Sequence, residues 1–291
     1  MTHKVAAIQM VSTGDVETNL ESAARLIGAA KAEGAELVLL PEVFAVLEGG
    51  PMLSYAENQG TGPIQEFLSD QARLNDLIIV GGTIPLITRP ANANGESETI
   101  DDGRVRPACL VYDSNGDVLA RYDKMHLFDV SVADAQSRYS ESRSYEAGDE
   151  IVCVDTPVGR LGLSVCYDLR FPEFYRELFR LQADIVTVPA AFTRVTGEAH
   201  WEALLRARAI ENQCYVIAAG QGGKHSERRE TWGHSMIIDP WGTVLDMIEI
   251  GEGIAVADID LDYLSNVRKR MPIADQQKLL AKFAGKIAGQ E

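Results

Sequence analysis

The sequence predicts an α/β fold with mixed β-sheets, and two patterns carry this prediction. Short apolar runs typical of buried strands alternate along the chain with segments of helical periodicity, which indicates helices layered on sheets. Two hairpin patterns are interspersed among them, and each hairpin adds an antiparallel strand pair. No linker divides the chain convincingly, so residues 1–291 are predicted to form one domain.

The first half of the chain contains three predicted strands, two predicted helices and a hairpin. The strands are expected at 4–10, 36–42 and 77–85, the helices at 18–34 and about 63–75, and the hairpin at 108–124. Gly34 lies where the first helix needs a C-cap. The run at 36–42 is continuously apolar, as in a strand buried on both faces. Residues 89–103 are polar and contain glycine, so a mobile loop is expected there.

The second half resumes the alternation. Strands are expected over Leu161–Val165 and at 184–190, 214–220 and 254–260, helices at 172–182 and 198–212, a hairpin turn at 240–243, and a short helix at the end. The helical spacing at 198–212 predicts core packing for four apolar residues. These are Trp201, Leu204, Leu205 and Ile210.

The charge of the chain excludes some classes of partner. The formal net charge is -16 at pH 7, whereas nucleic acid and anionic membrane both require a basic face. Neither is therefore expected as a partner. An anionic substrate remains compatible with the sequence if a local group of arginines and lysines binds it.

The cysteines and the first residues indicate a cytoplasmic protein. The four cysteines form no C-x-x-C pair, and no Cys/His spacing resembles a zinc site. Free thiols in a reducing compartment are expected, with no metal and no cofactor. The apolar run in "MTHKVAAIQM" is far too short for a signal peptide or a membrane span.

Three complementary side chains each end a predicted strand: Glu42, Lys124 and Cys166. In α/β sheets, ligands gather beyond the carboxyl ends of strands. Alone, the cysteine would be a small hydrophobe finishing a strand, the lysine a surface charge and the glutamate a cap. Together they suit attack on an amide or nitrile carbon, because a thiol needs an adjacent base. Lys124 and the backbone N–H of Tyr167 would stabilise the oxyanion.

The motifs around these residues resemble those of the nitrilase superfamily of carbon-nitrogen hydrolases, over about residues 3–270. The matching segments are "LLPEVF", "RYDKMHLFD" and "GLSVCYDLRFPE", in the family's order. The resemblance implies a four-layer α-β-β-α sandwich with two mixed sheets. It also implies a Cys166 nucleophile, a Glu42 base, an oxyanion-stabilising Lys124 and a second glutamate. That second glutamate is assigned to Glu141, with Glu146 as the weaker choice.

Residues 190–245 resemble the branch that contains deaminated glutathione amidases and ω-amidases. "LLRARAIENQCYVIAA" followed by "GQGGKH" is more similar to the amidases of deaminated glutathione. This resemblance implies a thioester mechanism that yields 2-oxoglutarate and cysteinylglycine. The alternative is an ω-amidase acting on α-ketoglutaramate, or on another small carboxylated linear amide. Both named substrates are anionic, and the family habit implies a homodimer or a larger homo-oligomer.

An α-keto carboxylate needs a specific cation, and Arg170 is the candidate because it follows the nucleophile closely and can fork onto a carboxylate. The structural alternative is that it pairs with Asp168 or Glu173. Phe192 and Thr196 are weaker candidates for the same pocket. The tail at 271–291 lacks the Arg-rich ending usual in the branch.

Three rival interpretations use other residues. A Cys-His protease would pair Cys166 with His126 or His234, and a zinc enzyme would use His200, Cys214 and His234 without any recognised ligand spacing. A non-catalytic binding module is a third possibility. It is disfavoured because the chain keeps Glu42, Lys124 and Cys166 together.

Overall fold

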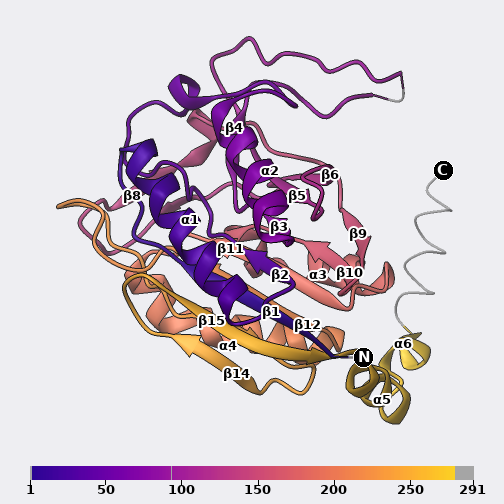
Figure 1. Cartoon of the computed structure of the whole chain (residues 1–291). Helices are drawn as coiled ribbons and strands as arrows, with labels where there is room; N and C mark the ends of the chain where they lie inside the picture. Colours follow the sequence, from indigo (N-terminus) through magenta and orange to yellow (C-terminus); the bar gives the residue numbers. More distant parts are fainter. Residues whose placement is uncertain (1, 93, 279–291) are drawn as a thin grey trace, which may run out of the picture.

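Two mixed β-sheets pack face to face, and helices cover the outer face of each (Figure 1). The structure is a computed structural model that describes residues 2–92 and 94–278. One apolar core lies between the sheets and combines residues such as Val5 and Leu37 with Val186 and Ile217. A second core lies between the first sheet and its helices. The four-layer α-β-β-α sandwich is therefore confirmed.

The first sheet has the order β15-β1-β2-β3-β5-β4, and β6 pairs with β5. Its strands are β1 (Thr2–Gln9), β2 (Leu37–Leu39), β3 (Ile78–Val80), β4 (Ile84–Leu86), β5 (Arg106–Tyr112), β6 (Val118–Asp123) and β15 (Gly253–Asp260). Strands β1, β2 and β3 run parallel, and the other pairs are antiparallel. Strands β5 and β6 form the predicted hairpin.

The second sheet has the order β14-β13-β12-β11-β10-β9. Its strands are β9 (Cys153–Thr156), β10 (Gly159–Leu163), β11 (Ile185–Ala190), β12 (Tyr215–Gly220), β13 (Ser235–Ile238) and β14 (Val244–Ile248). Strands β10, β11 and β12 are parallel. A separate hairpin joins β7 (Asp129–Ser131) to β8 (Arg138–Ser140).

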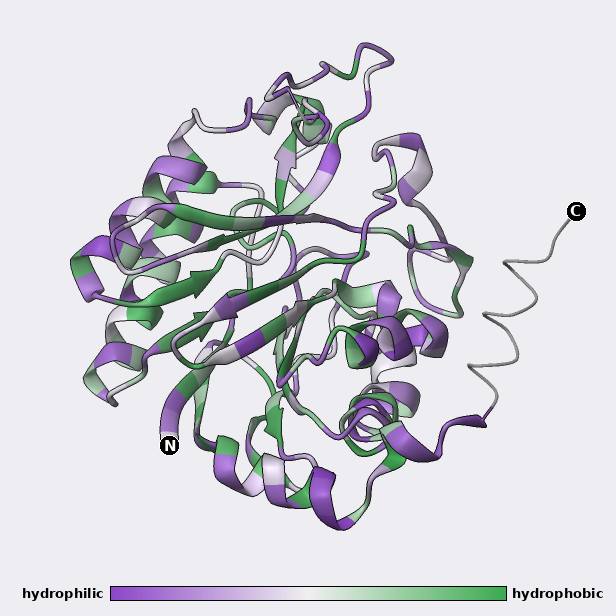
Figure 2. Ribbon diagram, turned by 90° about the vertical axis from the view of Figure 1, so that its right-hand side faces the viewer, coloured by the Kyte–Doolittle hydropathy of each residue, from purple (hydrophilic) through white to green (hydrophobic). Residues whose placement is uncertain are grey.

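Helices α1 and α2 cover the first sheet, whereas α3 and α4 cover the second (Figure 1). Their bounds are α1 (Val16–Ala32), α2 (Pro63–Asn75), α3 (Pro172–Arg180), α4 (Arg194–Asn212), α5 (Leu261–Arg270) and α6 (Ile273–Gln276). Figure 2 shows hydrophobic residues along the strands and mixed character on the helices. Within residues 2–92 and 94–278, none of the helices has both the length and the apolar character of a membrane-spanning segment.

The boundaries of helix α1 are set by the residues at its two ends. The Asp15 side chain caps its N-terminus by accepting from the backbone N–H of Glu17 and Thr18, which satisfies donors that the first turn leaves unpaired. Gly34 follows the helix with a positive φ of 87°, a conformation that glycine adopts without steric cost. The helix ends at Ala32 with Glu33 as its C-cap, so Gly34 lies one residue beyond the C-cap and does not occupy the predicted cap position.

Three other predictions are wrong in detail. The single strand expected at 77–85 is two strands, β3 and β4, because the chain turns at Gly82 with a φ of 58°. A side chain at position 82 would collide with the carbonyl oxygen of Pro41. Helix α4 begins before the predicted residue 198, since Thr193 caps it. Ile210 is 47% exposed and does not pack in the core.

The predicted C-terminal tail is described only in part, because its residues 279–291 lie outside the described residues.

Candidate active site

The predicted triad residues meet at one edge of the sandwich, where the two sheets adjoin. Glu42 follows β2 and Lys124 follows β6 in the first sheet, whereas Cys166 follows β10 in the second. The Nζ atom of Lys124 donates to Glu42 Oε1 at 2.8 Å. Cys166 and Glu42 line the same cavity. Strand ends far apart in the sequence thus form one cluster of a thiol, an ammonium and a carboxylate.

Glu42 is held in place from both sheets. The backbone turns sharply after it, because Val43 has a positive φ of 51° and its N–H donates to Thr83 Oγ1 at 2.9 Å. The Oε2 atom of Glu42 accepts from the backbone N–H of Ala191, which follows β11 in the second sheet, at 2.8 Å. One carboxylate oxygen therefore binds Lys124 and the other binds the second sheet, so the carboxylate has a single fixed orientation.

Lys124 is buried with two carboxylates. Its side chain is 1% exposed, and Nζ also donates to Glu141 Oε2 at 2.8 Å. Burial alone would lower the pKa of Lys124. The charges of Glu141 and Glu42 outweigh it and hold that pKa well above its ordinary value. Lys124 is thus a fixed ammonium at neutral pH, as an oxyanion donor must be.

Cys166 sits on a strained turn between β10 and the short helix η3 (Cys166–Arg170). Its φ is 48°, a left-handed conformation that costs of order 1–3 kcal/mol for a residue other than glycine. Such strain is typical of functional sites, where it presents a side chain at a strand end. Burial raises the pKa of the Cys166 thiol well above its ordinary value, as does the charge of Glu42, while Lys124 opposes both. The resting thiol is therefore protonated and needs a base.

Asp168 ties this turn to the first sheet. Its carboxylate is fully buried and accepts from Tyr122 Oη on β6 at 2.6 Å and from the Val165 N–H at 2.8 Å. It also binds His126 through the backbone N–H and Nδ1. Because Tyr122 and His126 flank Lys124, this one carboxylate fixes the lysine relative to the nucleophile. From the sequence, Asp168 is expected only as a possible partner of Arg170, so this structural role is not indicated by any pattern.

The two glutamates considered for the second acidic position have different surroundings. Glu141 lies in η2 (Glu141–Arg143) and binds Lys124, and its Oε2 also accepts from the Phe128 N–H at 2.8 Å. Glu146 instead binds two guanidinium groups, those of Arg89 and Arg106. The structure thus brings Glu141, and not Glu146, to the lysine.

A narrow cavity of about 10 Å³ adjoins the nucleophile. Its lining includes the predicted nucleophile, all the predicted substrate-binding residues and an arginine that the sequence does not indicate. These are Cys166, Tyr167, Arg170, Phe192, Thr196 and Arg229. Thr196 lies in the first turn of α4, and Phe192 packs on Trp201 with ring centroids 4.8 Å apart. The backbone N–H of Tyr167 lies in the first turn of η3, where N–H groups lack helical partners.

Arg170 does not make either of the pairs considered as its structural alternative. Its guanidinium lies 5.2 Å from the centre of the Phe192 ring and 3.2 Å from His200 Nδ1. Asp168 is occupied by its own partners, and no ion pair joins Arg170 to a carboxylate in the part of the chain that is described. Arg170 is therefore free to bind an anion in the narrow cavity.

A wide cavity of about 310 Å³ begins at the same carboxylates. Its lining includes Glu42, Lys124, Tyr139, Glu141, Tyr145 and Arg229. A volume of this size is in the range of small-molecule sites. The two cavities share Glu42, Glu141 and Arg229, so a substrate spanning both would place its centre at the triad.

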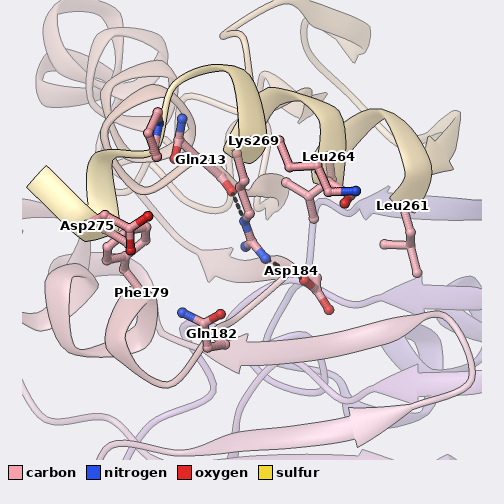
Figure 3. Close-up of a pocket in the computed structure, with 12 residues that line it drawn as sticks. Phe179, Gln182, Asp184, Gln213, Leu261, Leu264, Lys269 and Asp275 are labelled. Atoms are coloured by element: carbon pink, nitrogen blue, oxygen red, sulfur yellow. Dashed lines mark hydrogen bonds and ion pairs between the residues drawn. The ribbon is translucent and has the colours of Figure 1, made fainter.

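A larger cavity lies elsewhere on the molecule. It measures about 710 Å³ and is lined by residues of α5 and by Phe179, Asp184 and Gln213 (Figure 3). None of the predicted site residues lines it. Within it, Arg268 pairs with Asp184 and donates to the Gln213 carbonyl oxygen, which indicates a brace for α5 and not a reaction site.

The rival catalytic residues are occupied elsewhere. His126 binds Asp168 and stacks on Phe171 with ring centroids 3.7 Å apart. His234 stacks on Trp232 and lies near its carbonyl oxygen. Over residues 2–92 and 94–278, no three His, Cys, Asp or Glu side chains are grouped so that they could hold a metal ion. The residues named for a protease or a zinc site thus form no such site.

The fold, with a thiol, an ammonium and two carboxylates gathered at one edge, is that of a carbon–nitrogen hydrolase. Residues 4–269 match the model of the carbon-nitrogen hydrolase family, and the chain belongs to that family. The predicted resemblance is thereby confirmed, as is the class of enzyme, a hydrolase acting on carbon–nitrogen bonds.

The similar proteins include several amidases. A deaminated glutathione amidase of Yersinia enterocolitica is 38% identical over 285 residues, covering 98% of this chain and 96% of that protein. One of Synechocystis sp. (strain PCC 6803 / GT-S) is 44% identical over 269 residues, covering 92% and 95%. The crystal structure of the C. elegans NitFhit protein superposes with a TM-score of 0.83 at 36% identity, over 95% of this chain. The chain spans only 65% of that solved protein's length.

Proposed function

We propose that this chain hydrolyses the amide of deaminated glutathione to 2-oxoglutarate and cysteinylglycine. The observation that carries the proposal is the pair of cavities that meet at Glu42 and Glu141. The wide cavity, of about 310 Å³, has room for a leaving group the size of a dipeptide. The narrow cavity, of about 10 Å³, holds Arg170 near the nucleophile and must widen to admit the acyl half. An ω-amidase releasing ammonia would leave the wide cavity without a role. The similarity to deaminated glutathione amidases supports the same substrate.

Acylation begins with the protonated thiol. Glu42 takes the proton of Cys166 while Sγ attacks the amide carbon and the carbonyl oxygen becomes an oxyanion. The Lys124 ammonium and the Tyr167 N–H stabilise this oxyanion, and removing one such donor typically costs about 10²–10³ in rate. Glu42 then returns the proton to the amide nitrogen, and the carbon–nitrogen bond breaks. Cysteinylglycine departs, and the acyl group remains bound to Cys166 as a thioester.

Deacylation uses the same groups in reverse. Glu42 takes a proton from a water that attacks the thioester carbon, and the same two donors again stabilise the oxyanion. The carbon–sulfur bond breaks, Cys166 regains a proton from Glu42, and 2-oxoglutarate is released. Glu141 holds the ammonium of Lys124 in place through both steps, because it accepts a hydrogen bond from Nζ directly.

The acyl half is oriented by Arg170. Its guanidinium faces the narrow cavity without a carboxylate partner in the described part of the chain and can fork onto the α-keto carboxylate. Phe192 and Thr196 form the wall behind that group. A cation at this point gives an acidic protein of charge -16 the local attraction that an anionic substrate needs.

The cellular setting is also part of the proposal. The cysteines at 109, 153, 166 and 214 are all free, which supports the reducing cytoplasm. A homodimer, or a larger homo-oligomer, is proposed from the resemblance to the branch. No nucleic acid or membrane partner is proposed.

The test compares 2-oxoglutarate release from deaminated glutathione and from α-ketoglutaramate by the purified chain. We expect a higher kcat/KM for deaminated glutathione. Cys166→Ala should abolish release from both substrates with an unchanged far-UV spectrum and Tm. Cys214→Ala is the matched control and should keep more than about a tenth of the activity, a barrier change under ~1.4 kcal/mol. A preference for α-ketoglutaramate would favour the ω-amidase alternative.

A further inference from the structure

Arg229 is a charged residue that lines both cavities and has no part in the proposed mechanism. It lines the narrow cavity beside Cys166 and the wide cavity beside Lys124. The sequence around it, "HSERRETWGH", carries no motif that assigns it a role. Its position at the junction of the two cavities raises the question of which part of a substrate it contacts.

The Arg229 guanidinium is positioned but incompletely satisfied. It lies 4.9 Å from the centre of the Tyr139 ring, and the Tyr139 hydroxyl is itself fixed by a 2.8 Å bond to Asp134. The Nε atom of Arg229 is buried and has no hydrogen-bond partner. A buried donor without an acceptor is costly, so this atom indicates a place for an acceptor from outside the chain.

The loop that carries Arg229 is held by its own hydrogen bonds. The Arg229 N–H donates to Ser226 Oγ at 3.1 Å, and its carbonyl oxygen accepts from the His225 N–H at 2.9 Å. Thr231 closes the loop by donating its N–H to the Gly223 carbonyl oxygen. Arg229 is therefore presented by a fixed loop, which lowers the entropy lost when it binds a ligand.

The charges around the wide cavity leave Arg229 as the available cation. Lys124 is already shared by Glu42 and Glu141. Glu48 also lines the cavity, but its Oε2 accepts from Ser226 Oγ. Among the ion pairs of residues 2–92 and 94–278, defined by an N···O distance up to 4.0 Å, none involves Arg229. The missing partner that fits a guanidinium fork is a carboxylate.

We infer that Arg229 binds the terminal carboxylate of the leaving dipeptide and so selects amides whose amine half is itself an acid. The inference rests on the proposed function, because it divides the two carboxylates of deaminated glutathione between two arginines. Arg170 lines only the narrow cavity of the two and takes the α-keto acid, whereas Arg229 also faces the wide cavity and takes the glycine carboxylate.

The experiment measures kcat/KM for deaminated glutathione and α-ketoglutaramate in the wild type, in Arg229→Met and in Arg228→Met. Arg228 is the exposed neighbour on the same loop and serves as the control. Arg229→Met should lower kcat/KM for deaminated glutathione by about 10- to 100-fold, mainly through KM, as expected for loss of a hydrogen-bonded charge pair. The same variant should change kcat/KM for α-ketoglutaramate by less than about threefold, because that substrate lacks the second carboxylate. Arg228→Met should change neither.

A second measurement uses the substrate instead of the variant. Deaminated glutathione with its terminal carboxylate converted to the amide should be a poorer substrate for the wild type by a similar factor. Amidation of the substrate should lower kcat/KM of Arg229→Met only slightly, because the substitution and the amidation remove the same interaction. This arm on the wild type remains decisive if Arg229→Met folds poorly.

The outcomes separate the inference from the proposed function. Equal losses on both substrates, or an amidation penalty of the same size in wild type and variant, would overturn the role of Arg229 alone. If the wild type releases 2-oxoglutarate from α-ketoglutaramate but not from deaminated glutathione, the proposed leaving group is wrong and the inference falls with it.

Discussion

Two ion clusters lie on neighbouring parts of the fold, one largely buried and one partly exposed, and they differ in which charge stands at the centre. In the first, which we term the catalytic cluster, the ammonium of Lys124 binds two carboxylates, those of Glu42 and Glu141. In the second, the arginine cluster, the carboxylate of Glu146 hydrogen-bonds Arg89 and Arg106 and also pairs with Arg104. The central group is thus one cation between two acids in the first cluster. In the second it is one acid among three cations, each of which also pairs with a further carboxylate.

The difference decides what each cluster can do. Hydrogen bonds from Arg89, and then from Arg106, lower the pKa of Glu146 to about 2 although burial opposes them, so this carboxylate accepts no proton near neutrality. In the catalytic cluster one cation is shared by two acids, and in the proposed mechanism one of them, Glu42, takes the proton of Cys166. We therefore expect the arrangement of charges, and not burial alone, to separate the proposed proton acceptor from a structural brace.

The largest expected effect is on the base. Glu42→Gln keeps the shape of the side chain and the acceptor for Ala191 but removes the proton acceptor. Hydrolysis should fall by about 10²–10⁴-fold, the usual contribution of a general base. Steady-state kinetics with deaminated glutathione checks this, alongside Glu146→Gln. A comparable fall in both variants would contradict the distinction between the clusters.

Lys124→Arg tests whether charge alone is sufficient in the catalytic cluster. The guanidinium is a wide, planar fork and cannot replace a compact ammonium between Glu42, Glu141 and an oxyanion. We expect kcat to fall by about 10²–10³-fold, the loss typical for one oxyanion donor. Turnover at the wild-type rate would show that Lys124 acts only as a buried positive charge.

Arg170→Ala should lower kcat/KM by about 10²-fold, because a charged hydrogen-bond pair with the substrate is lost. The rate at which iodoacetamide alkylates Cys166 should barely change, since that reagent is neutral. If both rates drop together, Arg170 supports the turn at η3 and another residue binds the carboxylate.

The pH dependence of Cys166 alkylation gives a finer test of the charges. The negative charge of Glu42 raises the pKa of Cys166, and Lys124 lowers it. Glu42→Gln removes a raising influence, so its alkylation profile should move to lower pH even though hydrolysis is lost. Lys124→Met should move the profile to higher pH. Shifts in the opposite directions would mean that these charges do not act on the thiol.

The smallest effect on activity is expected in the arginine cluster. Glu146→Gln should keep kcat/KM within a few-fold and lower stability by about 1–3 kcal/mol, the value of hydrogen bonds to a charged group. The pKa of Glu146 falls from 4.5 to about 2 on folding, so its contribution is complete above pH 4.5 and is lost as pH falls toward 2. The difference in Tm between wild type and variant should shrink over that interval in thermal melts.

The strand ends were predictable from sequence because each follows an apolar run. Glu42, Lys124 and Cys166 are such ends, and their chemistry pointed to one site before any geometry was known. Glu141 lies in a short irregular segment and could be assigned only by resemblance. Its hydrogen bond to Lys124 brings it beside the triad, a position that no periodicity indicates.

Arg229 and the break between β3 and β4 show what sequence patterns do not contain. Arg229 reaches the site from a polar loop whose path depends on contacts with Ser226 and Gly223, and a loop arginine has no distinguishing pattern. The apolar run at 77–85 has the composition of one strand, and its turn depends on the approach of Pro41 from another strand end. Long-range packing decides both.

The close approach of Gly82 to Pro41 has a consequence for how sequences of this fold can diverge. Position 82 combines a positive φ with a backbone oxygen where a side chain would begin, and Thr83 next to it accepts from the turn that follows Glu42. Any replacement would displace the segment carrying the base. In a saturation library selected for hydrolysis, position 82 should tolerate as few substitutions as position 166, although Gly82 takes no part in the chemistry.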